Sequence, residues 1–162
     1  MRIKIKFKNR KGVSPVIELV FVLPILIGLV FAILYSGIVG NQMIALTNAA
    51  REGVRTFCIE ANNPQADPFD DAYSVMQQQI VGTAIDFNKM KNGTTFTRTA
   101  IWNNGQYQPD NTVITPANLS NLHFHDKVEI NIQYQTLFDS IFLGVFHPVL
   151  HAKSEYLIEY MY

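Results

Sequence analysis

The chain has a single cysteine and one long stretch that is almost free of charge. Cys58 is the only cysteine among the 162 residues, so no disulfide can form within the chain. We therefore expect packing to stabilise any part outside a membrane. A buried Cys58 thiol is the favoured interpretation, and a disulfide to another chain is the alternative.

Basic residues are scarce after Gly12, where seven Lys or Arg stand against thirteen Asp or Glu. Proteins that bind nucleic acid need clusters of Lys and Arg to contact the phosphates. The acidic remainder of the chain therefore predicts no nucleic-acid partner.

Motifs that carry catalysis or hold cofactors are also missing. No HExxH motif, phosphate-cradling glycine loop, nucleophile motif or pair of catalytic carboxylates is present. His123 and His125 would share a strand face, and His147 and His151 stand four residues apart, but without further ligands they make a weak metal site. We predict that the protein is no enzyme and has no catalytic, cofactor-binding or metal-binding residues.

Residues 16–40 form an apolar run whose one charge is Glu18. At ~1.5 Å per residue such a helix is about 37 Å long, which suffices to cross a hydrocarbon core of ~30 Å. Six Lys or Arg precede Gly12, and this basic leader predicts a cytoplasmic N-terminus and attraction to anionic membrane lipid. A cleaved secretory signal has a shorter apolar part and an A-x-A-like site, and neither is found here. We expect a single-pass protein of the cytoplasmic (inner) membrane with an extracytoplasmic C-terminal domain.

Helical periodicity continues from residue 41 to about residue 60, which predicts an amphipathic stalk. Asp67 as N-cap and Pro68 at the first helical position then open a second helix that is expected to end near Phe87. The apolar stripe of this helix consists of Phe69, Ala72, Tyr73, Met76, Ile80 and Ala84.

The C-terminal part alternates with the period of β-strands. Strands are predicted over residues 94–102, 127–135 and 151–162, and the turn at residues 103–105 favours a hairpin with residues 106–108. We expect Val128, Ile130, Ile132 and Tyr134 to face a core covered by helix. The fold class is therefore α+β, with a leader (1–12), a helix (13–60) and an extracytoplasmic domain (61–162). The apolar segment 137–150 either lies buried under the sheet or touches the bilayer or a partner subunit.

Two segments of the first helix resemble a known family. They are IELVFVLP at residues 17–24 and LTNAAREGVR at residues 46–55. They are similar to the VEFALVLP and LTNAAREGAR segments of TadE-like and TadG-like minor pilins, or pseudopilins, of the tight-adherence (Flp) pilus system. TadG-like members often carry a large extra domain for which this chain has no room, so the resemblance is to TadE-like proteins.

The resemblance implies cleavage of the leader by a prepilin peptidase between Gly12 and Val13. Glu18 lies close to the cytoplasmic surface. Either its carboxylate is simply solvated at the interface, or it pairs with the freed amino group of this or a neighbouring subunit and so sets the register of assembly. In type IV pilins the Glu is usually the fifth residue after the cut, whereas Glu18 is the sixth. Partners implied by the family are other pilins or pseudopilins and the inner-membrane pilus assembly platform.

Elementary chemistry adds expectations for the same helix. Pro24 removes one helical hydrogen bond and should kink the membrane segment. A ridge of small residues at four-residue spacing would let another helix approach closely, and it consists of Gly28, Ala32, Ser36 and Gly40.

The stalk motif predicts two further features. Ala49, Ala50 and Gly53 are expected to offer a flat surface, in a motif completed by Asn48, Arg51, Glu52 and Arg55. Arg51 and Arg55 would repel each other on one helical face, so we expect a carboxylate from Glu155, Glu159 or a partner chain beside them.

The sequence thus predicts a minor pilin, pseudopilin or assembly factor of a Flp-type pilus that acts by helix packing and subunit interaction. The alternative is a membrane-anchored extracytoplasmic domain that binds or senses a ligand and never enters a fibre.

Overall fold

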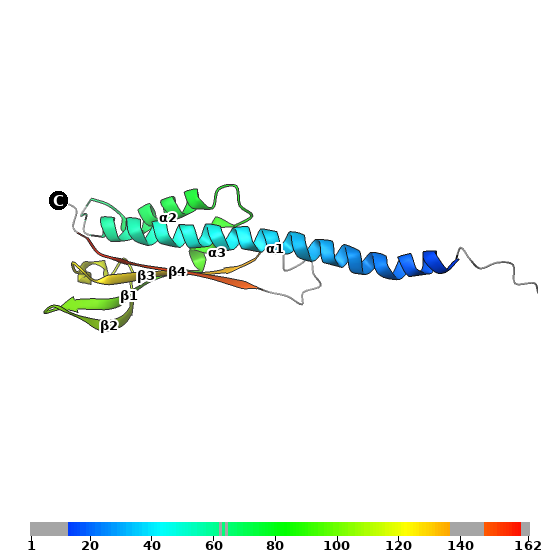
Figure 1. Cartoon of the computed structure of the whole chain (residues 1–162). Coiled ribbons are helices and arrows are strands. Elements are labelled where there is room, and N and C mark those ends of the chain that lie inside the picture. Colours follow the sequence, from blue (N-terminus) through cyan, green and yellow to red (C-terminus); the bar gives the residue numbers. More distant parts are fainter. Residues whose placement is uncertain (1–12, 62, 64, 137–147, 160–162) are drawn as a thin grey trace, which may run out of the picture. The chain divides into compact units, whose positions relative to one another are not determined.

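A computed structural model describes residues 13–61, 63, 65–136 and 148–159 of the chain (Figure 1). Contacts within the chain divide it into two compact units, residues 1–38 and residues 39–162. In its described residues, the second unit contains part of one long α-helix, two shorter α-helices, a 3-10 helix (η1, Leu119–Asn121) and a sheet, and it is called the sheet unit below.

Helix α1 (Val13–Glu60) is the longest element and contributes to both units. Its N-terminal part is long and apolar enough to cross a membrane, and its apolar side chains from Leu19 to Leu34 are exposed. Pro24 lies inside this part of the helix. The predicted helix over residues 13–60 is confirmed.

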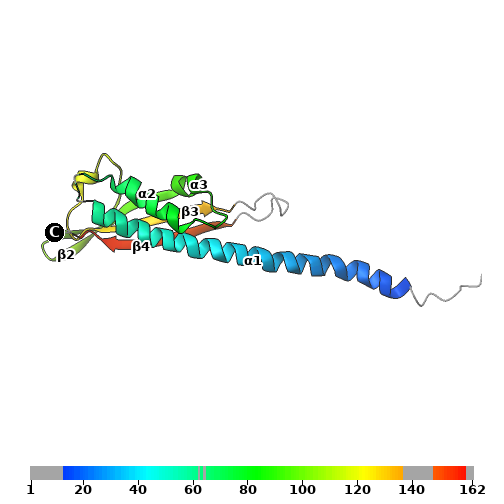
Figure 2. The same ribbon diagram turned by 90° about the horizontal axis from the view of Figure 1, so that it is seen from above.

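The sheet unit has two layers. Four antiparallel strands form one sheet in the order β2-β1-β3-β4, and residues 39–60 of α1 lie with α2 over one face of it (Figures 1 and 2). The segment predicted as a stalk is therefore part of the core layer of this unit. The α+β class expected from the sequence is confirmed.

Helix α2 (Pro68–Gln79) begins as predicted but ends early. The Asp67 side chain accepts hydrogen bonds from the backbone N–H groups of Phe69 (3.1 Å) and Asp70 (3.3 Å), which satisfies two donors of the first turn. The predicted end near Phe87 is wrong, because the chain turns at Gly82, whose φ of 79° favours glycine. Ala84 is therefore exposed and lies outside the apolar stripe.

Helix α3 (Phe87–Asn92) is a short element that the sequence analysis missed. Its N-cap is Asp86, whose carboxylate accepts hydrogen bonds from the N–H groups of Asn88 (2.9 Å) and Lys89 (3.3 Å). The Asp86 N–H in turn donates to the Tyr134 hydroxyl of β3 at 3.0 Å, so the cap is fixed to the sheet.

Strands β1 (Thr94–Asn103) and β2 (Gln106–Val113) form the predicted hairpin, although β2 is five residues longer than expected. The turn residues Asn104 and Gly105 have φ angles of 48° and 83°. Both are positive, as the two central residues of a type I′ hairpin turn require. β3 (Lys127–Gln135) has the predicted bounds, and its four apolar residues are buried.

Strand β4 (Val149–Leu157) begins earlier and ends earlier than the predicted strand at residues 151–162. Its residues Ala152 and Tyr156 face the core as expected, and Ile158 beyond its end is fully buried. Tyr160, Tyr162 and most of the apolar segment 137–150 lie outside the described residues.

The core lies between the helices and the sheet. Aromatic side chains from the two helices and the sheet meet in this core: Phe57 of α1 and Phe69 of α2 each pack on Phe96 of β1, with ring centroids 4.8 and 5.1 Å apart. Tyr73 of α2 adds an edge contact to Phe96 at 5.7 Å. α2 therefore covers β1, while α1 covers the middle of the sheet.

Candidate functional site

The motif at residues 46–55 has two chemically different faces on α1. Its inner face is fully or almost fully buried in the core of the sheet unit and consists of Leu46, Ala49, Ala50, Gly53 and Val54. The prediction that Ala49, Ala50 and Gly53 form a flat surface for another subunit is wrong. All three are buried in the core of their own chain, and Met76 of α2 lies against Gly53.

Gly53 shows why small residues are needed at this place. A Cβ atom there would lie 2.6 Å from Cγ and 2.7 Å from Sδ of Met76 on α2, and 3.3 Å from Cδ1 of Ile130 on β3. These distances are below normal van der Waals contact. The absence of a side chain at Gly53 therefore lets α2 and the sheet approach α1 together.

The outer face of the motif is exposed to solvent. We define the outer stripe as Ile44, Asn48, Arg51 and Arg55, all exposed and spaced along one side of α1. Ile44 is 63% exposed, and the two guanidinium groups stand one turn apart. The stripe combines an apolar end with a cationic end.

The expected partners of the two arginines are not the ones found. Arg55 Nη1 lies 3.8 Å from Glu52 Oε2 in an exposed i, i+3 pair. Glu155 instead lies on the sheet, where it contacts Lys127 (3.6 Å) and Thr99 (3.0 Å). Among the residues that the structure describes, no carboxylate forms an ion pair with Arg51. Neither arginine forms an ion pair with Glu155 or Glu159, both of which the structure describes, so this prediction is wrong. A carboxylate from a partner chain stays a prediction.

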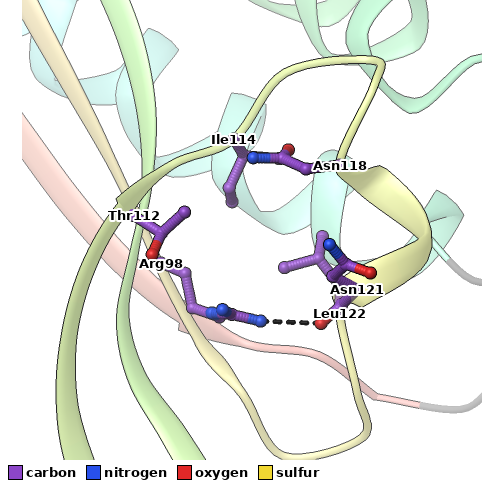
Figure 3. Close-up of a pocket in the computed structure, with 6 residues that line it drawn as sticks. All are labelled: Arg98, Thr112, Ile114, Asn118, Asn121 and Leu122. Carbon is purple, nitrogen blue, oxygen red and sulfur yellow. Dashed lines mark hydrogen bonds between the residues drawn. The ribbon is translucent and has the colours of Figure 1, made fainter.

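A second polar cluster, which the sequence analysis missed, surrounds Arg98 on β1. Its Nε donates to Asp110 Oδ2 at 2.6 Å, and its Nη1 donates to the Asn121 carbonyl at 2.6 Å (Figure 3). The hydrogen bond from Arg98 lowers the pKa of Asp110 from its usual 3.8. Arg98 thereby ties the hairpin to the loop that precedes β3.

The buried carboxylate of Asp126 completes this cluster. Its Oδ2 lies 3.6 Å from Arg98 Nη1 and accepts a hydrogen bond from the His123 N–H at 2.9 Å, while its Oδ1 accepts one from the Trp102 N–H at 3.0 Å. The prediction that His123 and His125 share a strand face is wrong, because both lie in the turn that Asp126 holds before β3. Asp126 has partners for both oxygens, which accounts for its burial.

A small cavity beside Arg98 has a volume of about 20 Å³, enough for one water molecule (Figure 3). It is lined by Arg98, Thr112, Ile114, Asn118, Asn121 and Leu122.

Cys58 is a free and fully buried thiol, as expected. Burial, with a smaller effect from the Glu159 carboxylate, raises its pKa from 9.0 to about 12. The thiol is therefore protonated at neutral pH and a poor nucleophile.

The predicted processing and register residues lie at the beginning of α1. Gly12 is outside the described residues, and Val13 is the first residue of the helix. Glu18 is exposed on α1, and Pro24 lies less than two turns further along. The proposed cleavage and pairing of these residues stay predictions.

Comparison with protein families matches residues 15–55 to the model of the family described as TadE-like protein. This segment of the chain is TadE-like. It contains Glu18, Pro24 and the whole of the 46–55 motif, and it ends at Arg55. The resemblance noted from the sequence is confirmed over these residues. The TadE-like segment relates the chain to Tad pilus proteins and, in general terms, to pilus assembly components.

No curated protein and no solved structure matches the chain. The TadE-like segment covers most of α1 but neither the sheet nor α2 and α3.

Proposed function

We propose that the protein is a minor pilin, pseudopilin or assembly factor of a Flp-type pilus. The observation that carries the proposal is that the TadE-like segment joins a membrane-length apolar helix to an exposed stripe on the same helix. The inner face of the motif is already occupied by α2 and the sheet. Contacts with other subunits along residues 44–55 are therefore left to the outer face of α1, most of which is the outer stripe.

The proposed topology places the basic leader in the cytoplasm and the sheet unit outside the cytoplasmic (inner) membrane. A prepilin peptidase then removes the leader between Gly12 and Val13. Within the bilayer, the ridge of Gly28, Ala32, Ser36 and Gly40 offers close approach to a neighbouring pilin helix.

Placing the Glu18 carboxylate in the membrane costs free energy unless the carboxylate is paired. A carboxylate near the middle of a membrane helix costs ~2.5–3.5 kcal/mol on insertion scales, and less near the interface. Pairing with a freed α-amino group in the same layer of the fibre would offset that cost. Glu18→Ala should therefore leave membrane insertion intact but reduce co-purification with other pilins, and unchanged co-purification would contradict the register role.

The outer stripe can be tested by charge reversal. The double variant Arg51→Glu, Arg55→Glu should keep the stability of the sheet unit, because exposed substitutions usually change it by less than ~0.5 kcal/mol. It should reduce pilus number and co-purification with other pilins. Lys89→Glu, Lys91→Glu is the matched control, since it makes the same charge change on α3. Equal piliation in both double variants would exclude the stripe as an assembly surface.

Cleavage of the leader would distinguish a pilin-like protein from one that is simply anchored in the membrane. Mass spectrometry of the mature protein should find Val13 at the N-terminus, and Gly12→Leu should keep the precursor at full length. If wild type and variant both keep the leader, the chain is not processed as a pilin. A membrane-anchored binding or sensory domain would then be the better description.

A further inference from the structure

Exposed aromatic rings gather at the end of the sheet unit where the β1–β2 hairpin turns. We define the aromatic patch as Trp102, Tyr107, Phe124 and His125. Trp102 and Tyr107 are 37% and 42% exposed and pair across the strands, with ring centroids 4.7 Å apart. The His125 ring lies 5.7 Å from Trp102 and 3.7 Å from Phe124. Scattered exposed rings need no explanation, but here three exposed rings are joined into one group through the partly buried ring of His125.

The patch lies on the face of the sheet that the helices leave open. Ala100 pairs with Lys127 of β3, and Trp102 is two residues further along β1, so its side chain is on the same face as Lys127. Figures 1 and 2 both place the β1–β2 turn at the end of the sheet unit where α1 terminates. Val39, the first residue of α1 that belongs to the sheet unit, lies at the opposite end of this unit.

The backbone beneath the rings is held in place before any ligand arrives. Asp126 accepts hydrogen bonds from the N–H groups of Trp102 and His123, and the His125 N–H donates to the Ile158 carbonyl at 3.1 Å. His125 is fixed at a φ of 69°, which a non-glycine residue rarely adopts. A rigid surface loses little conformational entropy when it binds a ligand.

Polar groups beside the rings indicate the charge of the ligand. Lys127 Nζ lies 4.8 Å from the centre of the Tyr107 ring and 3.6 Å from Glu155 Oε1, and Glu155 also accepts a hydrogen bond from Thr99. The cation and the anion therefore neutralise each other. A ligand of either sign would gain little here, and a dry protein interface would have to desolvate both charges.

We propose that the aromatic patch binds the neutral sugar rings of an oligosaccharide. The C–H face of a pyranose ring is apolar and stacks on Trp and Tyr rings, while its hydroxyl groups both donate and accept hydrogen bonds. Such hydroxyls can accept from Lys127 and donate to Glu155 without separating that pair. The proposal goes beyond pilus assembly and does not depend on it.

Trp102 is the single tryptophan of the chain, so its fluorescence reports on the patch directly. Full-length protein, in a detergent without a sugar headgroup, is titrated with neutral gluco-, manno-, galacto- and N-acetylglucosamine oligosaccharides up to 20 mM. We expect at least one of these series to change the Trp102 emission saturably. No saturable change with any of them would overturn the proposal.

Variants show whether the patch itself carries the binding, measured by calorimetry because some lack tryptophan. Trp102→Ala should weaken the affinity at least tenfold, Trp102→Phe should retain most of it, and Lys127→Met should weaken it several-fold. Val81→Ala, at an apolar residue that is 76% exposed elsewhere on the unit, should have no effect. Protection of Cys58 from maleimide checks that each variant is folded. Full affinity in a folded Trp102→Ala variant, or a Trp102-dependent dimer in place of sugar binding, would refute the assignment.

Discussion

Replacing Gly53 by alanine tests the close contact between α1, α2 and the sheet. The new Cβ would lie 2.6 Å from Met76 Cγ, an atom near the stem of a side chain that is fully buried. Met76 cannot move into solvent to make room. Overpacking of this kind typically costs ~1–3 kcal/mol.

Helix propensity acts in the opposite direction. Alanine favours a helix interior over glycine by ~0.8–1 kcal/mol, so the net loss for Gly53→Ala should be about 1 kcal/mol, within roughly 0 to 2. That corresponds to a fall in the melting temperature of roughly 4 °C for a domain of this size. Gly40→Ala is the matched control, because a Cβ at Gly40 would meet no atom within 4 Å. This variant should show only the stabilisation that comes from the higher helix propensity of alanine.

A double-mutant cycle isolates the contact from these background effects. Met76→Ala removes the atoms that clash, so Gly53→Ala should turn from destabilising to stabilising by ~1 kcal/mol in that background. Urea unfolding of the full-length protein in detergent can be followed by labelling of Cys58, which is buried in the folded state. If Gly53→Ala stabilises the wild-type protein as much as Gly40→Ala does, α2 does not approach α1 as closely as described.

Three more predictions concern titratable groups of the sheet unit. Asp126→Asn should lower the free energy of unfolding by ~3 kcal/mol, because it removes the charge opposite Arg98 and places an amide donor against a backbone N–H; a urea midpoint equal to wild type would contradict this. Asp110 has a pKa below its usual 3.8 in the folded state, so its stabilising effect is present above that pH and is lost as the pH falls through the lower folded value. Asp110→Asn should therefore destabilise the protein at pH 7, and the difference from wild type should shrink towards pH 2 in urea titrations. Cys58 should resist iodoacetamide at pH 8 until the protein unfolds, and rapid alkylation of the folded protein would be inconsistent with its raised pKa.

Features that depend on neighbouring residues were predictable from the sequence. The N-cap at Asp67, the hairpin turn at Asn104 and Gly105, and the bounds of β3 all follow from local backbone preferences or from the alternation of apolar residues. The apolar part of α1 was equally clear, because its length and lack of charge suffice to identify it. The early end of α2 was missed because Gly82 is a weak signal inside an otherwise helical pattern.

The direction in which the 46–55 motif faces could be decided only by the tertiary structure. Small residues on a helix permit close approach of either another subunit or the same chain, and the sequence does not distinguish these possibilities. The fold does, because α2 returns antiparallel to α1 and places Met76 over Gly53. Asp126 is a similar case, since its partners Arg98 and Trp102 lie on another strand, with Trp102 separated from it by 24 positions. Local preferences thus determined the elements, whereas contacts distant in sequence determined which surfaces were left for partners.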